Sequence, residues 1–100
     1  MNICLICNSG MSTSVLVRKM RESAVIRKLE VNIEAYSADA VDKIKGQADV
    51  ILVGPQIRHM VPEIEKTVSG ACPVGIISMR DFGMINGENV LDQSLLLINT

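Results

Sequence analysis

Aromatic residues are nearly absent from this chain of 100 residues, which contains no tryptophan, one tyrosine (Tyr36) and one phenylalanine (Phe82). Proteins that bind single-stranded nucleic acid stack bases on aromatic side chains, and this sequence offers no such platform. An excess of one charge is lacking too, because ten basic residues face eleven acidic ones and the formal net charge is -1. Binding to a phosphate backbone depends on a marked cationic excess, so the composition argues against a nucleic-acid partner.

Long hydrophobic runs are also missing. No stretch approaches the roughly 18 apolar residues of a membrane-spanning helix, so we expect no direct membrane insertion. The first ten residues, MNICLICNSG, have neither the basic lead-in nor the small-residue cleavage site of a signal peptide. Three cysteines without an export signal favour a reducing compartment, where free thiols persist, and we therefore expect a cytoplasmic protein.

The residues that are present predict one globular domain over 1–100, since 48% are hydrophobic and 21% are charged. Short apolar or alternating runs rich in β-branched residues predict strands. These are NICLI (2–6), VNIEAY (31–36), DVILVG (49–54) and PVGIIS (73–78). Between and after them, helical patterns occupy 12–29, 38–46, 61–69 and about 88–98.

The first of these helices is amphipathic. Leu16, Met20 and Ala24 recur at intervals of four, with Val17 and Val25 beside them, so we expect this face to be buried. Strict alternation of strand and helix predicts an α/β fold: a single three-layer domain with a four-stranded parallel sheet and helices on both faces. In such a sheet, ligands bind beyond the carboxyl ends of the strands.

Cys7 falls at the carboxyl end of the first predicted strand, and the loop after it leads into the first helix. The unpaired N–H groups and the dipole of a helix N-terminus attract an anion, and glycine allows close approach of the backbone. The candidate phosphate-binding residues are Asn8, Ser9, Gly10, Met11, Ser12, Thr13 and Ser14. The helix field should lower the pKa of the Cys7 thiol, and the thiolate would be a nucleophile toward phosphorus. Each piece also has a plainer interpretation, a buried cysteine and a helix N-cap.

Cys4 and Cys7 spell C-x-x-C, a spacing found in redox pairs and zinc sites. On an extended strand their Cα atoms would lie roughly 10 Å apart, with side chains on opposite faces, beyond the ~7 Å that a disulfide tolerates. Zinc requires four convergent ligands, and the remaining candidates, His59 and Cys72, are not paired in spacing. We therefore expect no metal and no cofactor, with Cys4 in the core and Cys72 in a structural role.

CNSGMSTSVLVRKM together with ADVILVGPQIRHMVPEI resembles the enzyme IIB component of the sugar phosphotransferase system, in its lactose/cellobiose/chitobiose branch. The resemblance covers nearly the whole chain and is loose only over FGMINGENVL. It implies a phosphotransferase in which Cys7 accepts a phosphoryl group from a phosphohistidine of enzyme IIA. Cys7 would then pass that group to a sugar, such as cellobiose, chitobiose or lactose, bound by the membrane protein enzyme IIC.

A cysteine phosphatase is the main alternative, because low-molecular-weight tyrosine phosphatases use a related loop. They place an arginine six residues after the cysteine, where this chain has Thr13, and an aspartate general acid before proline, whereas no Asp-Pro occurs here. A phosphocysteine would then survive long enough to be passed on, which favours a carrier. A flavin or nucleotide module and a response-regulator receiver remain as rivals, although a receiver needs an aspartate where this chain has Gly54.

The segment GPQIRHM after the third strand should lie at the same edge of the sheet as Cys7. Loops at such an edge often bind ligands or partners, so Pro55, Gln56, Arg58 and His59 are candidate contacts to phosphate or to partner proteins. The alternative for Arg58 and His59 is a solvated turn. We expect the protein to be a monomer.

Overall fold

The computed structural model describes residues 1–8 and 10–99. The strands are β1 (Asn2–Ile6), β2 (Asn32–Tyr36), β3 (Val50–Val53) and β4 (Val74–Ile76). The α-helices are α1 (Met11–Ile26), α2 (Val41–Ile44), α3 (Val61–Val68), α4 (Met79–Gly83) and α5 (Gly87–Ile98), and two 3-10 helices are η1 (Ala38–Ala40) and η2 (Pro55–Met60).

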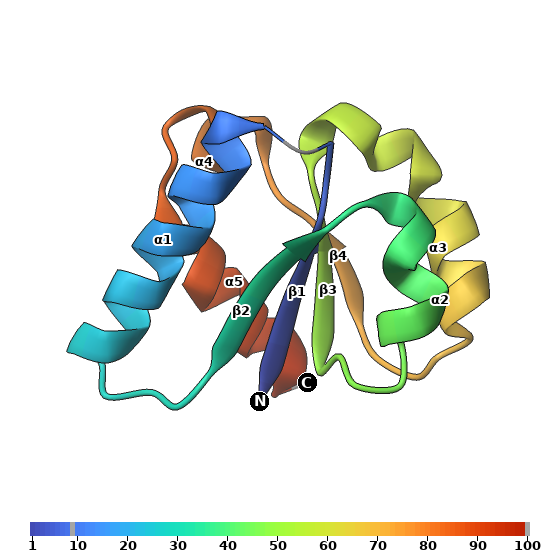
Figure 1. Ribbon diagram of the computed structural model, residues 1–100, viewed down its shortest axis with the longest axis horizontal. Helices are drawn as coiled ribbons and strands as arrows, with labels where there is room; N and C mark the ends of the chain where they lie inside the picture. Colours follow the sequence, from blue (N-terminus) through green and yellow to red (C-terminus); the bar gives the residue numbers. More distant parts are fainter. Residues whose placement is uncertain (9, 100) are drawn as a thin grey trace.

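All strand pairs in the sheet are parallel, in the order β2-β1-β3-β4. Helices cover both faces, with α1, α4 and α5 on one side and α2 and α3 on the other (Figure 1). The predicted α/β fold with a four-stranded parallel sheet is therefore confirmed. Because β2 and β3 flank β1 on opposite sides, the winding reverses at β1, and its carboxyl end is where a ligand site is expected.

The continuous apolar runs of the central strands serve two cores, because successive side chains leave opposite faces of a strand. Ile3 and Leu5 of β1 pack with Leu52 of β3 against α1 and α5. Cys4 and Ile6 pack on the other face, with residues of α2 and α3. The prediction that Cys4 belongs to the core is confirmed. Among the described residues, no helix has the length and apolar character needed to cross a membrane.

The first helix ends earlier than predicted, at Ile26 instead of residue 29, because Lys28 adopts a left-handed φ of 58°. The N–H of Lys28 donates to the Val25 carbonyl oxygen and the N–H of Leu29 to that of Ala24, which is the Schellman pattern that closes a helix. Placing Val25 on the buried face was also wrong, since it is 75% exposed. It lies in the last turn of α1, beside Ile26, which is 81% exposed.

Two short elements were not predicted. α4 begins after Ser78, whose hydroxyl oxygen accepts from the N–H of Asp81, and this Ser-x-x-Asp spacing was a readable N-cap signal. The segment after β3, expected as a loop, forms η2, which runs directly into α3. The second predicted helix is also shorter than 38–46, because η1 takes up residues 38–40.

Candidate active site

Cys7 follows β1 directly and is buried, with 3% of its surface exposed. Its N–H donates to the carbonyl oxygen of Tyr36, at 3.2 Å, which extends the pairing between β1 and β2 by one residue. Its Sγ lies 3.3 Å from the hydroxyl oxygen of Thr13, in the first turn of α1. Thr13 is itself buried, 4% exposed, so the first turn of α1 holds a hydroxyl against the sulfur.

The N-terminus of α1 lies over this cysteine. Gly10 is the N-cap residue, and the N–H of Ser14 makes the first helical bond, to the Gly10 carbonyl oxygen at 3.3 Å. The N–H groups of residues 11–13 precede that bond and have no acceptor within the helix ladder. A Cβ added to Gly10 would meet none of the described atoms within 4 Å, so packing does not require glycine here. These donors and the positive end of the helix dipole can bind an anion.

The hollow that is lined by Cys7 has a volume of about 330 Å³. Another hollow, of about 360 Å³, lies between α2 and α3 and does not include Cys7. The hollow at Cys7 is lined by Cys7, Gly10, Thr13, Ser14, Ala35, Tyr36 and Ser37. Its walls are thus the start of α1 and the end of β2. The contribution of β2 was not foreseen from the sequence, although Tyr36 ends a strand that was predicted correctly.

The other residues of the predicted phosphate-binding loop do not line the hollow at Cys7 or are not described. Asn8, Met11 and Ser12 are exposed and do not line the hollow, and Ser9 lies outside the described residues. Their role in binding phosphate stays a prediction, as it does for the lining residues. The structure therefore brings Cys7, Gly10, Thr13 and Ser14 together at one hollow.

The second candidate loop is η2. Gln56 is exposed, but its Oε1 lies 3.2 Å from the point that a Cβ on Gly54 would occupy, and the Cβ of Cys7 lies 2.7 Å from the same point. The Gln56 side chain is thus a neighbour of Cys7. Pro55 is half-buried, whereas Arg58 and His59 are exposed on η2 and do not line the hollow. Sequence reasoning missed Gly54, whose signal was a glycine directly after a buried strand beside β1.

The expectation of a lowered thiol pKa was wrong for the protein as it stands. Burial raises the pKa of Cys7 above 9.0, and the hydrogen bond with Thr13 opposes that rise without cancelling it. Removal of the sulfur from water disfavours the thiolate, and the sequence does not reveal how deeply the thiol is buried. Burial therefore favours the thiol form of Cys7, and the Thr13 hydroxyl beside the sulfur favours the thiolate.

The other two cysteines lie on the face of the sheet covered by α2 and α3. Cys4 is in the core there and Cys72 is half-buried against it, and all three thiols are free. Burial, followed by the nearby Cys72, raises the pKa of Cys4 to about 11. Neither of these two cysteines lines the hollow at Cys7.

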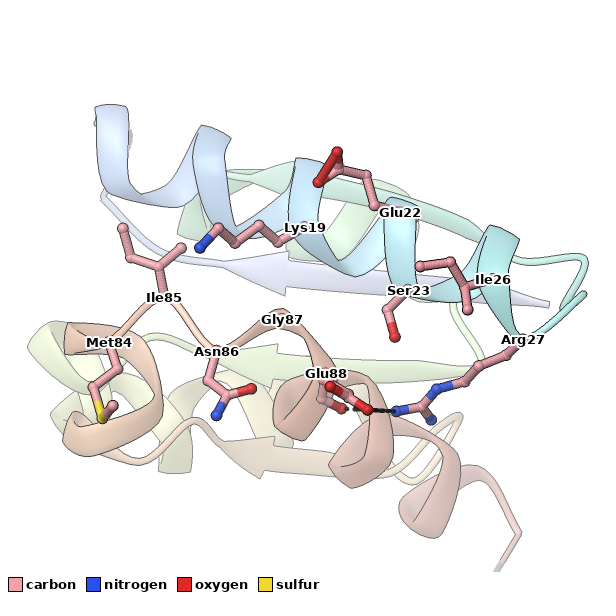
Figure 2. Close-up of a pocket in the computed structure, with 10 residues that line it drawn as sticks. All are labelled: Lys19, Glu22, Ser23, Ile26, Arg27, Met84, Ile85, Asn86, Gly87 and Glu88. Atoms are coloured by element: carbon pink, nitrogen blue, oxygen red, sulfur yellow. Dashed lines mark hydrogen bonds and ion pairs between the residues drawn. The ribbon is translucent and has the colours of Figure 1, made fainter.

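A larger hollow, of about 460 Å³, lies between α1 and the segment that leads into α5 (Figure 2). Its lining includes Lys19, Glu22, Met84 and Asn86, and it contains no cysteine or histidine. The dashed contact in Figure 2 joins Arg27 to Glu88 across one end of the groove. The larger volume therefore does not by itself favour this groove as the reactive site, because it lacks the buried thiol that lies at the N-terminus of α1.

Comparisons with known proteins agree with this geometry. The family model described as "PTS system, Lactose/Cellobiose specific IIB subunit" matches residues 2–93. The galactose-specific EIIB component of Lactococcus lactis subsp. cremoris and the cellobiose-specific EIIB component of Lactococcus lactis subsp. lactis are each 37% identical over 103 residues, covering 97% of this chain and 95% of the relative. The oligo-beta-mannoside-specific EIIB component of Bacillus subtilis is 37% identical over 97 residues, covering 96% and 94%.

Solved structures show the same fold. The cellobiose-specific phosphotransferase IIB component of Borrelia burgdorferi superposes with a TM-score of 0.84 at 34% identity, covering 99% of this chain and 92% of that one. The lactose-specific IIB domain of Streptococcus pneumoniae gives the same TM-score at 16% identity, covering 97% and 96%, and supports the fold alone. The chain therefore belongs to the family of lactose/cellobiose-specific IIB subunits of the sugar phosphotransferase system (PTS), which are phosphotransferases.

Proposed function

We propose that Cys7 carries a phosphoryl group, accepted from a phosphohistidine of enzyme IIA and passed to a sugar bound by the membrane protein enzyme IIC. The observation that supports this most strongly is the position of the Cys7 thiol. It lies at the base of a hollow under the N-terminus of α1, with the Thr13 hydroxyl 3.3 Å from the sulfur. Backbone N–H groups at the start of α1 can donate hydrogen bonds to a phosphoryl group on this sulfur, and the Thr13 hydroxyl forms a hydrogen bond with the sulfur itself.

The proposed chemistry consists of two displacements at phosphorus. The Cys7 thiol gives up its proton and its sulfur attacks the phosphohistidine, a P–S bond forms, the P–N bond breaks and the imidazole of enzyme IIA leaves with a proton on the freed nitrogen. A sugar hydroxyl then loses its proton and attacks, a P–O bond forms, the P–S bond breaks and the departing sulfur takes up a proton, which restores the Cys7 thiol. Phosphoryl transfer needs mainly in-line placement and stabilisation of the equatorial oxygens, and the free N–H groups of residues 11–13 supply that stabilisation.

The same geometry favours a carrier over a phosphatase. Thr13 stands where the related phosphatases place an arginine, and it is buried against the sulfur. A guanidinium that grips the equatorial oxygens in two places is thus absent from that position. Hydrolysis also needs a group that activates water or protonates a leaving group, and Thr13 supplies neither function.

We assign the sugar to the disaccharide class, such as cellobiose, chitobiose or lactose. Relatives with equal identity to this chain are named for galactose, cellobiose and an oligo-beta-mannoside, so identity at this level does not select one sugar, and in our proposal enzyme IIC does. The exposed Arg58 and His59 of η2 are proposed contacts to the two partner proteins. The three free thiols fit a reducing cytoplasm.

A monomeric state is part of the proposal. Its support comes from the two edge strands of the sheet, β2 and β4. In each of them a backbone carbonyl that faces away from the sheet accepts a hydrogen bond from a side chain. Arg21 donates to the Ile33 carbonyl oxygen of β2 through Nη2, at 2.6 Å, and Gln93 donates to that of Ile76 in β4, at 2.8 Å. Capped edge carbonyls are less available for pairing with a second copy.

The test is phosphoryl transfer from phosphorylated enzyme IIA of the same PTS branch, followed by intact-protein mass spectrometry. The wild-type protein should gain the mass of one phosphoryl group, and Cys7→Ser should gain none, because a serine hydroxyl stays protonated and is a weaker nucleophile. Cys72→Ser is the matched control and should be labelled normally. Stoichiometric labelling of Cys7→Ser would exclude this assignment, and steady Cys7-dependent turnover of p-nitrophenyl phosphate would make the protein a hydrolase.

A further inference from the structure

Cys7 and Gly54 come directly after neighbouring strands, β1 and β3. The register pairs Ile6 with Val53, and the Gly54 N–H donates to the Ile6 carbonyl oxygen at 2.8 Å, so the two residues lie side by side beyond the sheet. Neighbouring strands are normally 4.7–4.9 Å apart, a spacing that accommodates a side chain on each. Here a Cβ on Gly54 would lie only 2.7 Å from the Cβ of Cys7, closer than the 3.0 Å that real Cβ atoms keep.

The backbone conformation of Gly54 does not explain why a residue without a side chain is needed at this position. Its φ of -63° and ψ of 145° are ordinary for any residue. Gly70 differs, because its φ of 78° favours glycine whatever surrounds it. At position 54, the neighbouring atoms impose the restriction, and the shortest contact is to the proposed nucleophile.

An added methyl group would displace Cys7 in preference to its other neighbour. Gln56 Oε1, at 3.2 Å, is the end of a flexible, exposed side chain and can swing away at little cost. The Cβ of Cys7 is attached directly to a backbone that is held by its hydrogen bond to Tyr36. Relief of the contact therefore requires a backbone shift between Cys7 and Gly54, which changes the position of the sulfur relative to Thr13 and the start of α1.

We propose that Gly54 is a positioning residue for phosphoryl transfer, an inference that rests on the proposed function of Cys7. The absence of a side chain at the end of β3 lets the ends of β1 and β3 converge. That convergence sets the location of the Cys7 thiol relative to Thr13 and the free N–H groups of α1.

The kinetic test is Gly54→Ala, with initial rates of transfer from phosphorylated enzyme IIA measured over a range of donor concentrations. A misplacement of about 1 Å can cost on the order of 100-fold in rate, so kcat should fall by between about 10-fold and 100-fold. KM for enzyme IIA should stay unchanged, because Gly54 does not line the hollow at Cys7 and is not among the proposed contacts to the donor. A kcat equal to that of the wild-type protein would overturn the proposal.

Gly87→Ala is the matched control. An added Cβ there would lie 2.7 Å from the backbone carbonyl carbon of Lys19, a contact as severe as that at Gly54 but located where α5 meets α1 (Figure 2). This variant should melt at a lower temperature yet transfer phosphate normally below its transition. Equal losses of kcat in the two variants would mean that general loosening of the fold, and not the position of Cys7, lowers the rate, and the proposal would fail.

A double-mutant cycle tests the contact itself without any phosphate. Gly54→Ala should lower the melting temperature when Cys7 is present. It should lower it much less in a Cys7→Gly background, where residue 7 has no Cβ that could clash with the added methyl group. If Gly54→Ala alone does not fold, recovery of folding in the double variant supports the same contact. Equal destabilisation in both backgrounds would overturn the proposal.

Labelling of the wild-type protein and the rate of transfer to Gly54→Ala together separate the failure of this inference from the failure of the proposed function. Absence of any label on wild-type Cys7 would remove the proposed function, and with it a positioning role in the transfer. Labelling of the wild-type and Gly54→Ala proteins to the same stoichiometry and at the same initial rate would refute only the role of Gly54.

Discussion

Thr13 is the residue whose chemistry is most closely tied to the Cys7 sulfur. Thr13→Val keeps the shape of the side chain and removes the hydroxyl, which lowers the pKa of Cys7 through its hydrogen bond. A hydrogen bond to a charged group is worth about 1.5–3 kcal/mol, so transfer at neutral pH should slow roughly 10-fold to 100-fold. The pH at which Cys7 is alkylated should also rise, as measured with iodoacetamide.

The matched control is Thr13→Ser, which retains the hydroxyl and should preserve both the transfer rate and the alkylation profile. If Thr13→Val and Thr13→Ser behaved alike, packing at position 13 and not the hydroxyl would be the relevant property. Alkylation of the wild-type protein should itself increase as the pH rises above 9.0, because burial raises the pKa of the thiol.

At the residue scale, sequence reasoning succeeded where a residue type and its place in the chain were enough. A cysteine, a glycine and hydroxyl residues between a strand and a helix predicted that Cys7 lies with Gly10, Thr13 and Ser14 at the start of α1, and the binding of phosphate there stays a prediction. Sequence reasoning failed where the outcome depended on depth or on distant neighbours. The burial of Cys7, which reverses the expected pKa direction, and the contact with Gly54 both arise only when β1 and β3 are side by side.

Lys28, two residues after the end of helix α1, has an unfavourable backbone conformation for a residue with a side chain. Lys28 occupies the left-handed position of the Schellman motif with a φ of 58°. A left-handed conformation costs a non-glycine residue roughly 1–2 kcal/mol, part of which glycine loses again through greater freedom in the unfolded chain. Lys28→Gly should therefore increase the free energy of unfolding by about 0.5–1 kcal/mol in urea denaturation.

Lys28→Ala separates this conformational effect from the loss of a charge. It removes the ammonium group but keeps the Cβ, so it should give no increase in stability. A gain in Lys28→Ala as large as that in Lys28→Gly would assign the effect to charge and contradict the conformational explanation.

The elements that were predicted best are those whose patterns reflect burial on both sides. The run VILV of β3 is buried throughout, and such a run has few alternatives to a central parallel strand. Short elements were missed because five or six residues contain too little periodicity, as in α4 and η2. The end of α1 was misplaced because lysine, unlike glycine, gives no signal of a left-handed turn.

On the scale of the whole molecule, the two cores differ in their response to pH. The core beneath α1 and α5 is built from aliphatic residues and Phe82, whereas the one beneath α2 and α3 contains Cys4, with Cys72 packed against it. Burial raises the pKa of both thiols, so the folded protein holds their protons more tightly than the unfolded chain does. Stability is therefore coupled to pH on the alkaline side through these two thiols on the face of the sheet opposite α1, in addition to Cys7 at the start of α1.

The sign of that coupling yields a prediction for alkaline unfolding. The contribution of a buried thiol is fully present below 9.0, the ordinary pKa, and is lost as the pH rises through the folded value, about 11 for Cys4. A tenfold change in proton affinity equals about 1.4 kcal/mol, so Cys4 sets an upper bound of about 3 kcal/mol on this loss. The free energy of unfolding should thus decline between pH 9 and pH 11.

Cys4→Ala isolates the thiol from every other group that titrates in this range. The variant should be less stable than the wild-type protein at pH 7, because a core side chain is truncated, yet its stability should decline less steeply above pH 9. The gap between the two proteins in urea denaturation should accordingly narrow as the pH rises. A gap of constant size from pH 7 to pH 11 would show that Cys4 keeps its proton equally well in the folded and unfolded chains, and burial of the thiol would then have no part in the alkaline limit of the fold.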